Sequence, residues 1–207
     1  MDRSIRILVV DDHPLFREGL AAVINSQPDM SLAGEAASGA ASLQKFRELR
    51  PDVTLMDVRL PDMSGIDAMI AILAEFNDAR IIPITTFEGD VDIRRALQAG
   101  AYGYAFKSMP PKELIDVIRH VNSGKRRVPP EVARQLAQHV ADETLTEREI
   151  DVLRYVSGGN RNREIAERLF ISQETVKVHL KHIMGKLGAN DRTEAVTIAV
   201  RRGIIQI

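Results

Sequence analysis

Short apolar runs alternate with helical patterns throughout the first 122 residues. Five runs rich in β-branched residues predict strands, and five stretches with apolar residues three or four positions apart predict helices. The predicted strands are residues 5–10, 30–34, 53–56, 81–85 and 102–106. The predicted helices are residues 14–25, 39–49, 66–75, 91–99 and 111–122. Regular alternation of this kind indicates βα units built around a parallel sheet.

The composition of these strands predicts their places in the sheet. The first, third and fourth are nearly continuous apolar runs, which is typical of strands covered by helices on both faces. The second is less apolar, which favours a place at an edge. The fourth contains Pro83, which has no ladder donor. We therefore expect a local bulge there, or a proline nitrogen that faces away from any pairing partner.

The pattern changes after residue 122. Residues 123–143 contain Gly124, a basic run and a Pro129–Pro130 helix start, and they predict a linker with a helix in it. Residues 144–207 show four helical segments and no strand pattern, at 147–156, 163–169, 173–187 and 192–202. Helix N-caps are expected at Thr146 with Glu149, at Ser172, and at Asp191 with Glu194. An α/β domain followed by an all-α domain is predicted.

Composition narrows the class of protein. The chain has 207 residues, of which 44% are hydrophobic and 28% charged, enough for one or two folded cores. It has no Cys, which excludes disulfides, thiolate metal sites and thiol nucleophiles. No signal-type segment and no run of about 18 apolar residues occurs, so a cytoplasmic location is expected.

Charge is distributed unevenly along the chain. The net charge is −1, but residues 1–122 hold 13 basic against 18 acidic residues, whereas residues 144–207 hold 11 basic against 8 acidic residues. An acidic half and a basic half indicate two different kinds of partner.

Chemically useful side chains stand at the ends of the predicted strands. Asp11 and Asp12 follow the first strand, and Asp57 follows the third. Because the carboxyl ends of parallel strands meet at one edge, these carboxylates should converge there and suit Mg²⁺. Thr85 and Lys107 follow the fourth and fifth strands and add a hydroxyl and an ammonium. This set is what formation of an aspartyl phosphate requires, although Asp-Asp after a strand is by itself more often a turn or helix cap.

A resemblance to a known family rests on four strings, VVDDH, LMDVRLPDMSG, ITTF and GYAFK. Residues 4–122 resemble the receiver domain of bacterial two-component response regulators. The resemblance implies a flavodoxin-like fold with strand order 2-1-3-4-5 and Asp57 as the phosphoacceptor. It implies a Mg²⁺ site formed by Asp12, Asp57 and the Arg59 carbonyl, with Asp11 acting through water. It also implies that the switch residues are Thr85, Tyr104 and Lys107, although Tyr104 by itself is more often a core aromatic.

Two further expectations concern this half of the chain. Many receivers have a proline after the lysine, joined by a cis peptide, but Lys107 is followed by Ser108, so the state of that bond is left open. None of the five His residues, His13 included, is expected to ligate a metal.

The basic half contains a candidate nucleic-acid reader. In the predicted helix 173–187, apolar residues at helical spacing should face a core, while Lys177, Val178 and Lys181 lie on the other side. The short connection from helix 163–169 is of helix-turn-helix type, and such a second helix enters the major groove of DNA. Taken alone, the two lysines are more often part of a solvated helix face.

Residues 144–205, with the string TVKVHLKHIMGKLG, resemble the LuxR/NarL-type DNA-binding domain. The resemblance implies base contacts by Lys177, Val178 and Lys181 and phosphate contacts by Thr175 and Arg163. It makes the last helix a dimerisation element, although its apolar residues could equally belong to the core.

Together the two resemblances predict a NarL/LuxR-class response regulator with a receiver at 4–122, a linker at 123–143 and a helix-turn-helix domain at 144–207. A sensor histidine kinase should phosphorylate Asp57, and the phosphorylated protein should bind operator DNA as a homodimer, with no membrane partner. Beyond its own phosphotransfer and dephosphorylation it is not expected to be an enzyme. The alternatives are a Mg²⁺-dependent phosphohydrolase, a DNA-binding protein with a vestigial acidic pocket, and a small-molecule-sensing regulator.

Overall fold

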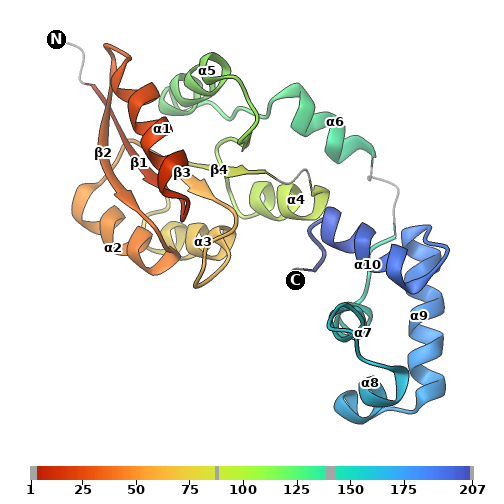
Figure 1. The fold of residues 1–207 in the computed structure, drawn as a ribbon. Helices are drawn as coiled ribbons and strands as arrows, with labels where there is room; N and C mark the ends of the chain where they lie inside the picture. The colour runs from red at the N-terminus through yellow and green to blue at the C-terminus, as the bar shows by residue number, and fades with distance from the viewer. Residues whose placement is uncertain (1–3, 87–88, 139–142, 206–207) are drawn as a thin grey trace. The chain divides into compact units, whose positions relative to one another are not determined.

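The computed structural model describes residues 4–86, 89–138 and 143–205. Contacts within the chain divide it into two compact units. One unit contains a sheet and the helices that cover it, and the other contains the C-terminal helices (Figure 1). None of the helices in these described ranges is long and apolar enough to cross a membrane.

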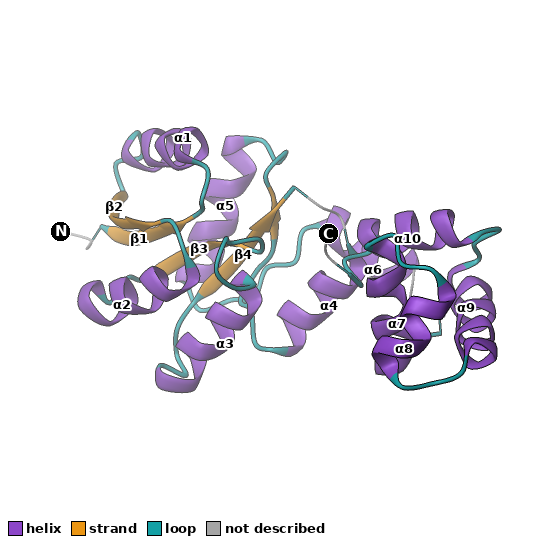
Figure 2. Ribbon diagram, turned by 60° about the horizontal axis from the view of Figure 1, so that its bottom comes forward, coloured by secondary structure: helices purple, strands orange, loops and turns teal. Residues whose placement is uncertain are grey.

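The first unit contains a five-stranded parallel sheet with the order β2-β1-β3-β4-β5, as the resemblance implied. Its strands are β1 (Ile5–Val10), β2 (Met30–Ala36), β3 (Val53–Asp57), β4 (Ile81–Thr85) and β5 (Ala105–Phe106). Its helices are α1 (Pro14–Asn25), α2 (Gly39–Leu49), α3 (Gly65–Glu75), α4 (Asp90–Gln98) and α5 (Pro111–Asn122). Figure 2 shows α1 and α5 on one face of the sheet and α2, α3 and α4 on the other. The weak second strand is at an edge, as predicted.

The fifth strand is shorter than predicted, and the expectation of a strand over residues 102–106 is wrong for its first half. Only Ala105 and Phe106 pair with β4. The Tyr102 N–H donates to the Ile81 carbonyl at 3.1 Å, and Gly103 forms an isolated bridge with Arg127. The chain therefore follows β4 at residue 102 but regular pairing begins only at residue 105.

Pro83 lies in the middle of β4 without a bulge. It is opposite Met56 in an unbroken register with β3. The Ile84 carbonyl accepts from the Val58 N–H on the β3 side at 3.0 Å. Because neighbouring residues of a strand bond in opposite directions, the Pro83 nitrogen faces the β5 side. That strand pairs only from Ile84 onward, so the proline removes no ladder bond. The second of the two expectations is therefore confirmed, and the bulge is not found.

The C-terminal unit is helical, as predicted. A helix, α6 (Pro130–Gln138), occurs within the predicted linker. It is followed by α7 (Glu147–Ser157), α8 (Asn162–Leu169), α9 (Gln173–Leu187) and α10 (Arg192–Arg201). The core contains the expected face of α9, together with residues of the other helices. The buried α9 residues are Val176, Leu180, Ile183 and Leu187.

The ends of these helices are fixed by the expected caps. Thr146 and Glu149 form a capping box at the start of α7, and Ser172 accepts from a backbone N–H in the first turn of α9. Gly188 ends α9 with a φ of 64°, a left-handed conformation that favours glycine. Glu149 is buried, and its carboxylate lies 2.8 Å from the Lys186 ammonium of α9. This pair links α7 to α9, the helix that carries the candidate DNA contacts.

Candidate functional site

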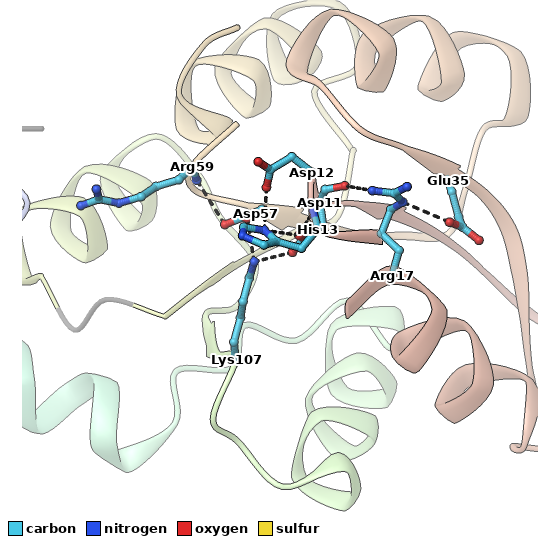
Figure 3. Close-up of polar contacts among 8 residues, drawn as sticks. All are labelled: Asp11, Asp12, His13, Arg17, Glu35, Asp57, Arg59 and Lys107. Carbon is cyan, nitrogen blue, oxygen red and sulfur yellow. Dashed lines mark hydrogen bonds and ion pairs between the residues drawn. The ribbon is translucent and has the colours of Figure 1, made fainter. Parts of the chain in front are cut away.

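Asp57 is the last residue of β3 and is 3% exposed. Both of its carboxylate oxygens have partners. Oδ2 accepts from the Lys107 ammonium at 2.7 Å, and Oδ1 accepts from the Arg59 backbone N–H at 3.1 Å (Figure 3). The buried carboxylate is thus held in one orientation at the carboxyl edge of the sheet.

Lys107 joins two strand ends. Its Nζ lies 2.6 Å from Oδ2 of Asp11, which follows β1, and 2.7 Å from Oδ2 of Asp57. Its backbone N–H donates to the Thr85 carbonyl at 2.7 Å, which fixes the lysine just beyond β5. The Phe16 ring of α1 lies 4.7 Å from the same ammonium. One buried cation is therefore shared by two carboxylates.

Burial and charge shift the protonation of this pair. Burial, together with the nearby Asp11 carboxylate, raises the pKa of Asp57 despite the hydrogen bonds from Lys107 and the Arg59 N–H. Burial alone would lower the pKa of Lys107, but its hydrogen bonds to Asp11 and Asp57 outweigh that effect and raise it. Lys107 thus remains an ammonium beside the two carboxylates.

The donor set fits Mg²⁺. Asp11, Asp12 and Asp57 each offer a carboxylate oxygen within one small cluster, and Asp12 is partly open to solvent. Hard oxygen donors with access to water are what Mg²⁺ prefers. A divalent cation would also offset the negative charge of Asp11 and Asp57, two buried carboxylates that share the Lys107 ammonium.

The turn after Asp57 is tightly packed. A Cβ on Gly65 would lie 1.8 Å from the Asp57 carbonyl oxygen, so only glycine fits where α3 begins. In the same turn, the Asp62 carboxylate accepts from the backbone N–H groups of Gly39 at 2.8 Å and Ala40 at 2.9 Å. These two bonds lower the pKa of Asp62. Asp62 therefore fastens the segment that contains Arg59 to the first turn of α2.

Sequence reasoning missed two residues here. Asp62 lies inside the quoted motif LPDMSG, but its partners are 22 and 23 positions away, at the start of α2. Arg17 donates to the Asp11 backbone carbonyl at 2.6 Å and pairs with Glu35 at 3.2 Å (Figure 3). Neither pairing has a local sequence signal, because each depends on how separate βα units pack.

His13 lies beside the carboxylates, although none of the histidines is expected to ligate a metal. The Nδ1 of His13 lies 2.7 Å from an oxygen of Asp12 and 3.1 Å from an oxygen of Asp11. It belongs to the only group of possible metal ligands found among the described residues. The sequence does not predict this closeness, because Asp11, Asp12 and His13 are consecutive, which is not a recognised ligand spacing.

The remaining residues of the predicted receiver site lie at the same edge or near it. Thr85 ends β4 and is 2% exposed. Tyr104 lies just before β5, is fully buried, and packs edge to face against Phe106 at 6.1 Å. The Lys107–Ser108 peptide is trans.

The predicted DNA contacts lie on two helices of the C-terminal unit. Lys177, Val178 and Lys181 are exposed on α9, with Thr175 half-buried near its start. Arg163 is exposed on α8. Lys177 pairs with Glu174 at 2.8 Å, and Arg163 pairs with Glu167 at 2.9 Å. Both pairs are exposed surface pairs, which contribute little stability.

Known families match both units. Residues 7–119 match the response regulator receiver domain, and residues 143–199 match the bacterial regulatory proteins of the luxR family. The chain belongs to the LuxR-type response regulators. This response regulator is 40% identical over 214 residues to the transcriptional regulatory protein YxjL of Bacillus subtilis, a match that covers 98% of each chain.

Other relatives agree with this placement. The response regulator is 35% identical over 208 residues to VraR of Staphylococcus aureus, covering 98% of this chain and all of VraR. Among solved structures, it is similar to the response regulator ChrA of a heme-sensing two-component system, with 37% identity and a TM-score of 0.60. That similarity covers 98% of this chain and 99% of ChrA. A receiver and a LuxR-type DNA-binding domain therefore form one transcriptional response regulator.

Proposed function

We propose that Asp57 accepts a phosphoryl group from the phosphohistidine of a sensor kinase. One Asp57 oxygen forms a bond to phosphorus while the phosphorus–nitrogen bond breaks, and its electron pair stays on the kinase imidazole. The observation that carries this proposal is the placement of Asp57, which is buried at the edge of the sheet with Lys107 on one oxygen. That ammonium can bind the incoming phosphoryl oxygens and offset their negative charge.

In this proposal, Asp12, Asp57 and the Arg59 carbonyl bind Mg²⁺, with Asp11 acting through a water molecule. When bound, Mg²⁺ neutralises charge on the phosphoryl oxygens and on the carboxylates. The chain itself does the positioning. The Arg59 N–H fixes one oxygen of Asp57, and Asp62 fastens the segment from which the Arg59 carbonyl projects. The same pocket promotes hydrolysis of the aspartyl phosphate, and no other enzymatic activity is proposed.

The switch residues in this proposal are Thr85, Tyr104 and Lys107. Thr85 carries a buried hydroxyl one residue beyond Ile84, which is opposite Asp57 in the β3–β4 register. A phosphoryl group on Asp57 that recruits this hydroxyl would draw the end of β4 inward. Such a movement changes the space around the buried Tyr104 ring and so favours one of two packings.

The output in this proposal is binding of a homodimer to double-stranded DNA. Lys177, Val178 and Lys181 would meet base edges in the major groove, while Thr175 and Arg163 would contact phosphates. The buried Ala195 and Ala199 place one face of α10 in the core of its own unit. The dimerising role of α10 would therefore use its other, partly exposed face. Two copies reading two half-sites multiply the specificity of one short helix.

The proposal is tested by measuring how phosphorylation changes DNA affinity. A DNA ligand is first selected from a random-sequence library with the full chain in Mg²⁺ and acetyl phosphate. Fluorescence anisotropy then compares wild type and Asp57→Asn, each with and without acetyl phosphate. Wild type should bind at least about tenfold more tightly when phosphorylated, whereas Asp57→Asn should not respond. Equal affinity in all four samples would overturn the switch.

A further inference from the structure

Helix α7 makes a polar contact with each of the two helices α8 and α9. It packs against both of them in the C-terminal unit. Two consecutive residues of α7 make the contacts. Arg148 donates from Nη2 to the backbone carbonyl of Leu169, which ends α8, and Glu149 pairs with Lys186 near the end of α9. The two helices are thus fastened to the same turn of α7.

The contact made by Arg148 holds the turn between α8 and α9. Phe170, the first residue after α8, has a φ of 54° and a ψ of 47°, a left-handed conformation that is unfavourable for an aromatic residue. The backbone N–H groups of Phe170 and Ile171 both donate to the Ala166 carbonyl. The Phe170 side chain is 94% exposed, so burial of the ring does not offset the cost of this backbone conformation. The bond from Arg148 therefore helps to keep the shape of the turn from outside it.

The contact made by Glu149 holds the far end of α9. The carboxylate is buried, and its Oε2 accepts from the Thr146 backbone N–H and from Lys186 Nζ, each at 2.8 Å. Lys186 also donates to the Thr144 carbonyl at 3.3 Å. Burial raises the pKa of Glu149, but the hydrogen bonds from Lys186 and Thr146 outweigh it and lower the pKa, so the carboxylate stays charged. Such a charged hydrogen bond is strong and directional, and it resists rotation of α9 about its axis.

The candidate DNA contacts lie between these two points. Lys177, Val178 and Lys181 are exposed on α9, after the turn held by Arg148 and before Lys186. Contacts with base edges require each side chain to be in a defined position, whereas long basic side chains reach phosphates from a range of positions. A small rotation of α9 would therefore impair discrimination between sequences more than it impairs electrostatic attraction to DNA.

We propose that Arg148 and Glu149 are positioning residues for the reading of DNA sequence. They hold α9 in the orientation in which its exposed residues meet base edges, and they do not contact DNA themselves. This inference rests on the proposed function, because it concerns the same DNA-binding surface. The competing explanation is that the two residues only stabilise the fold. In that case a variant that is still folded would discriminate between DNA sequences as well as wild type does.

The test measures binding of two DNA duplexes to the full chain in Mg²⁺ and acetyl phosphate. One duplex is the selected DNA ligand, and the other has the same base composition in scrambled order. Fluorescence anisotropy gives both dissociation constants, at a temperature at which circular dichroism shows each variant to be folded. The ratio of the two constants measures discrimination between sequences.

This ratio should fall about tenfold in Arg148→Met and in Glu149→Gln, which is comparable to the effect of one mismatched base pair. The affinity for the scrambled duplex should change less than about threefold, because that binding is electrostatic. One variant loses a positive charge and the other a negative charge. A loss of discrimination that both share therefore cannot arise from net charge.

Matched variants of the same helix serve as controls. Arg154→Met and Glu147→Gln remove the same two kinds of charge from exposed positions of α7, and they should leave the ratio unchanged. Arg148→Lys can still donate a hydrogen bond to the Leu169 carbonyl and should recover most of the discrimination.

The outcomes distinguish this inference from the proposed function. An unchanged ratio in Arg148→Met and Glu149→Gln would overturn the inference, even if both variants melt at a lower temperature. Equal losses of affinity for the two duplexes would overturn it too, because discrimination would be intact. In both cases wild type discriminates and the proposed function stands. Wild type that binds the two duplexes equally would contradict the proposed function itself, and the inference with it.

Discussion

The ammonium of Lys107 lies 2.7 Å from Oδ2 of Asp57, and this contact joins the end of β5 to the end of β3. The same ammonium lies 2.6 Å from Asp11. Two buried carboxylates therefore share one ammonium, and a bound metal ion would add further positive charge. This imbalance gives both the metal and the phosphoryl chemistry a physical basis.

Removing Lys107 should destabilise the metal-free protein. Lys107→Met leaves two buried carboxylates without their cation, and loss of one partner of a buried pair costs about 3 kcal/mol. Urea unfolding followed by circular dichroism measures this loss, with the exposed Lys112→Met of α5 as the matched control. Added Mg²⁺ should recover part of the loss. If Lys107→Met is as stable as the control, the contact of Lys107 with the two carboxylates does not contribute to the free energy of unfolding.

The raised pKa of Asp57 gives stability a definite pH dependence. Folded Asp57 binds its proton more tightly than the unfolded chain does, because of burial and the neighbouring Asp11 carboxylate. The stability that Asp57 contributes through this shift is therefore fully present below the ordinary aspartate pKa. It is lost as the pH rises through the raised pKa of the folded protein. The Asn side chain of Asp57→Asn does not ionise. In the absence of metal, and at a pH above the raised pKa of Asp57, this variant should melt a few degrees higher than wild type.

Melting curves of both proteins across acidic and neutral pH check this sign. The two curves should converge at low pH, and Mg²⁺ should narrow the gap at neutral pH. A variant that melts below wild type at neutral pH would indicate that Asp57 is stabilising when charged, contrary to the argument from burial.

Asp62 should support the metal site without touching the metal. Asp62→Ala frees the segment that contains Arg59 from the two N–H groups of α2. Outer residues of this kind typically change metal affinity by about tenfold or more. Isothermal titration with Mg²⁺ compares this variant with Asp78→Ala, an exposed aspartate near the other end of α3. Equal affinity in both would remove Asp62 from the account of the site.

The exposed lysines of α9 should carry electrostatic binding to DNA. Lys177→Ala and Lys181→Ala should each weaken binding and lower the slope of log affinity against log salt by about one. Arg201→Ala, at the end of α10, serves as the control cation. Anisotropy titrations at several salt concentrations measure the slopes. Unchanged slopes for both lysine variants would place the DNA interface elsewhere.

Much of the site was accessible from the sequence because each residue directly follows an apolar run. Asp11, Asp57 and Lys107 could be placed together because the carboxyl ends of parallel strands meet at one edge of the sheet. The start of β5 could not be predicted in this way. The pattern typical of a strand already begins at residue 102, although regular pairing begins only at Ala105. The closeness of His13 to the carboxylates depends on how its ring turns, which no residue pattern encodes.

The proposed switch depends on Asp57 as the phosphoacceptor. Intact mass spectrometry after incubation with Mg²⁺ and acetyl phosphate tests it most directly, on wild type and Asp57→Ala side by side. We expect one added phosphoryl group on wild type, and none on Asp57→Ala or on wild type without metal. An adduct that persists on Asp57→Ala, or no adduct on wild type, would contradict it.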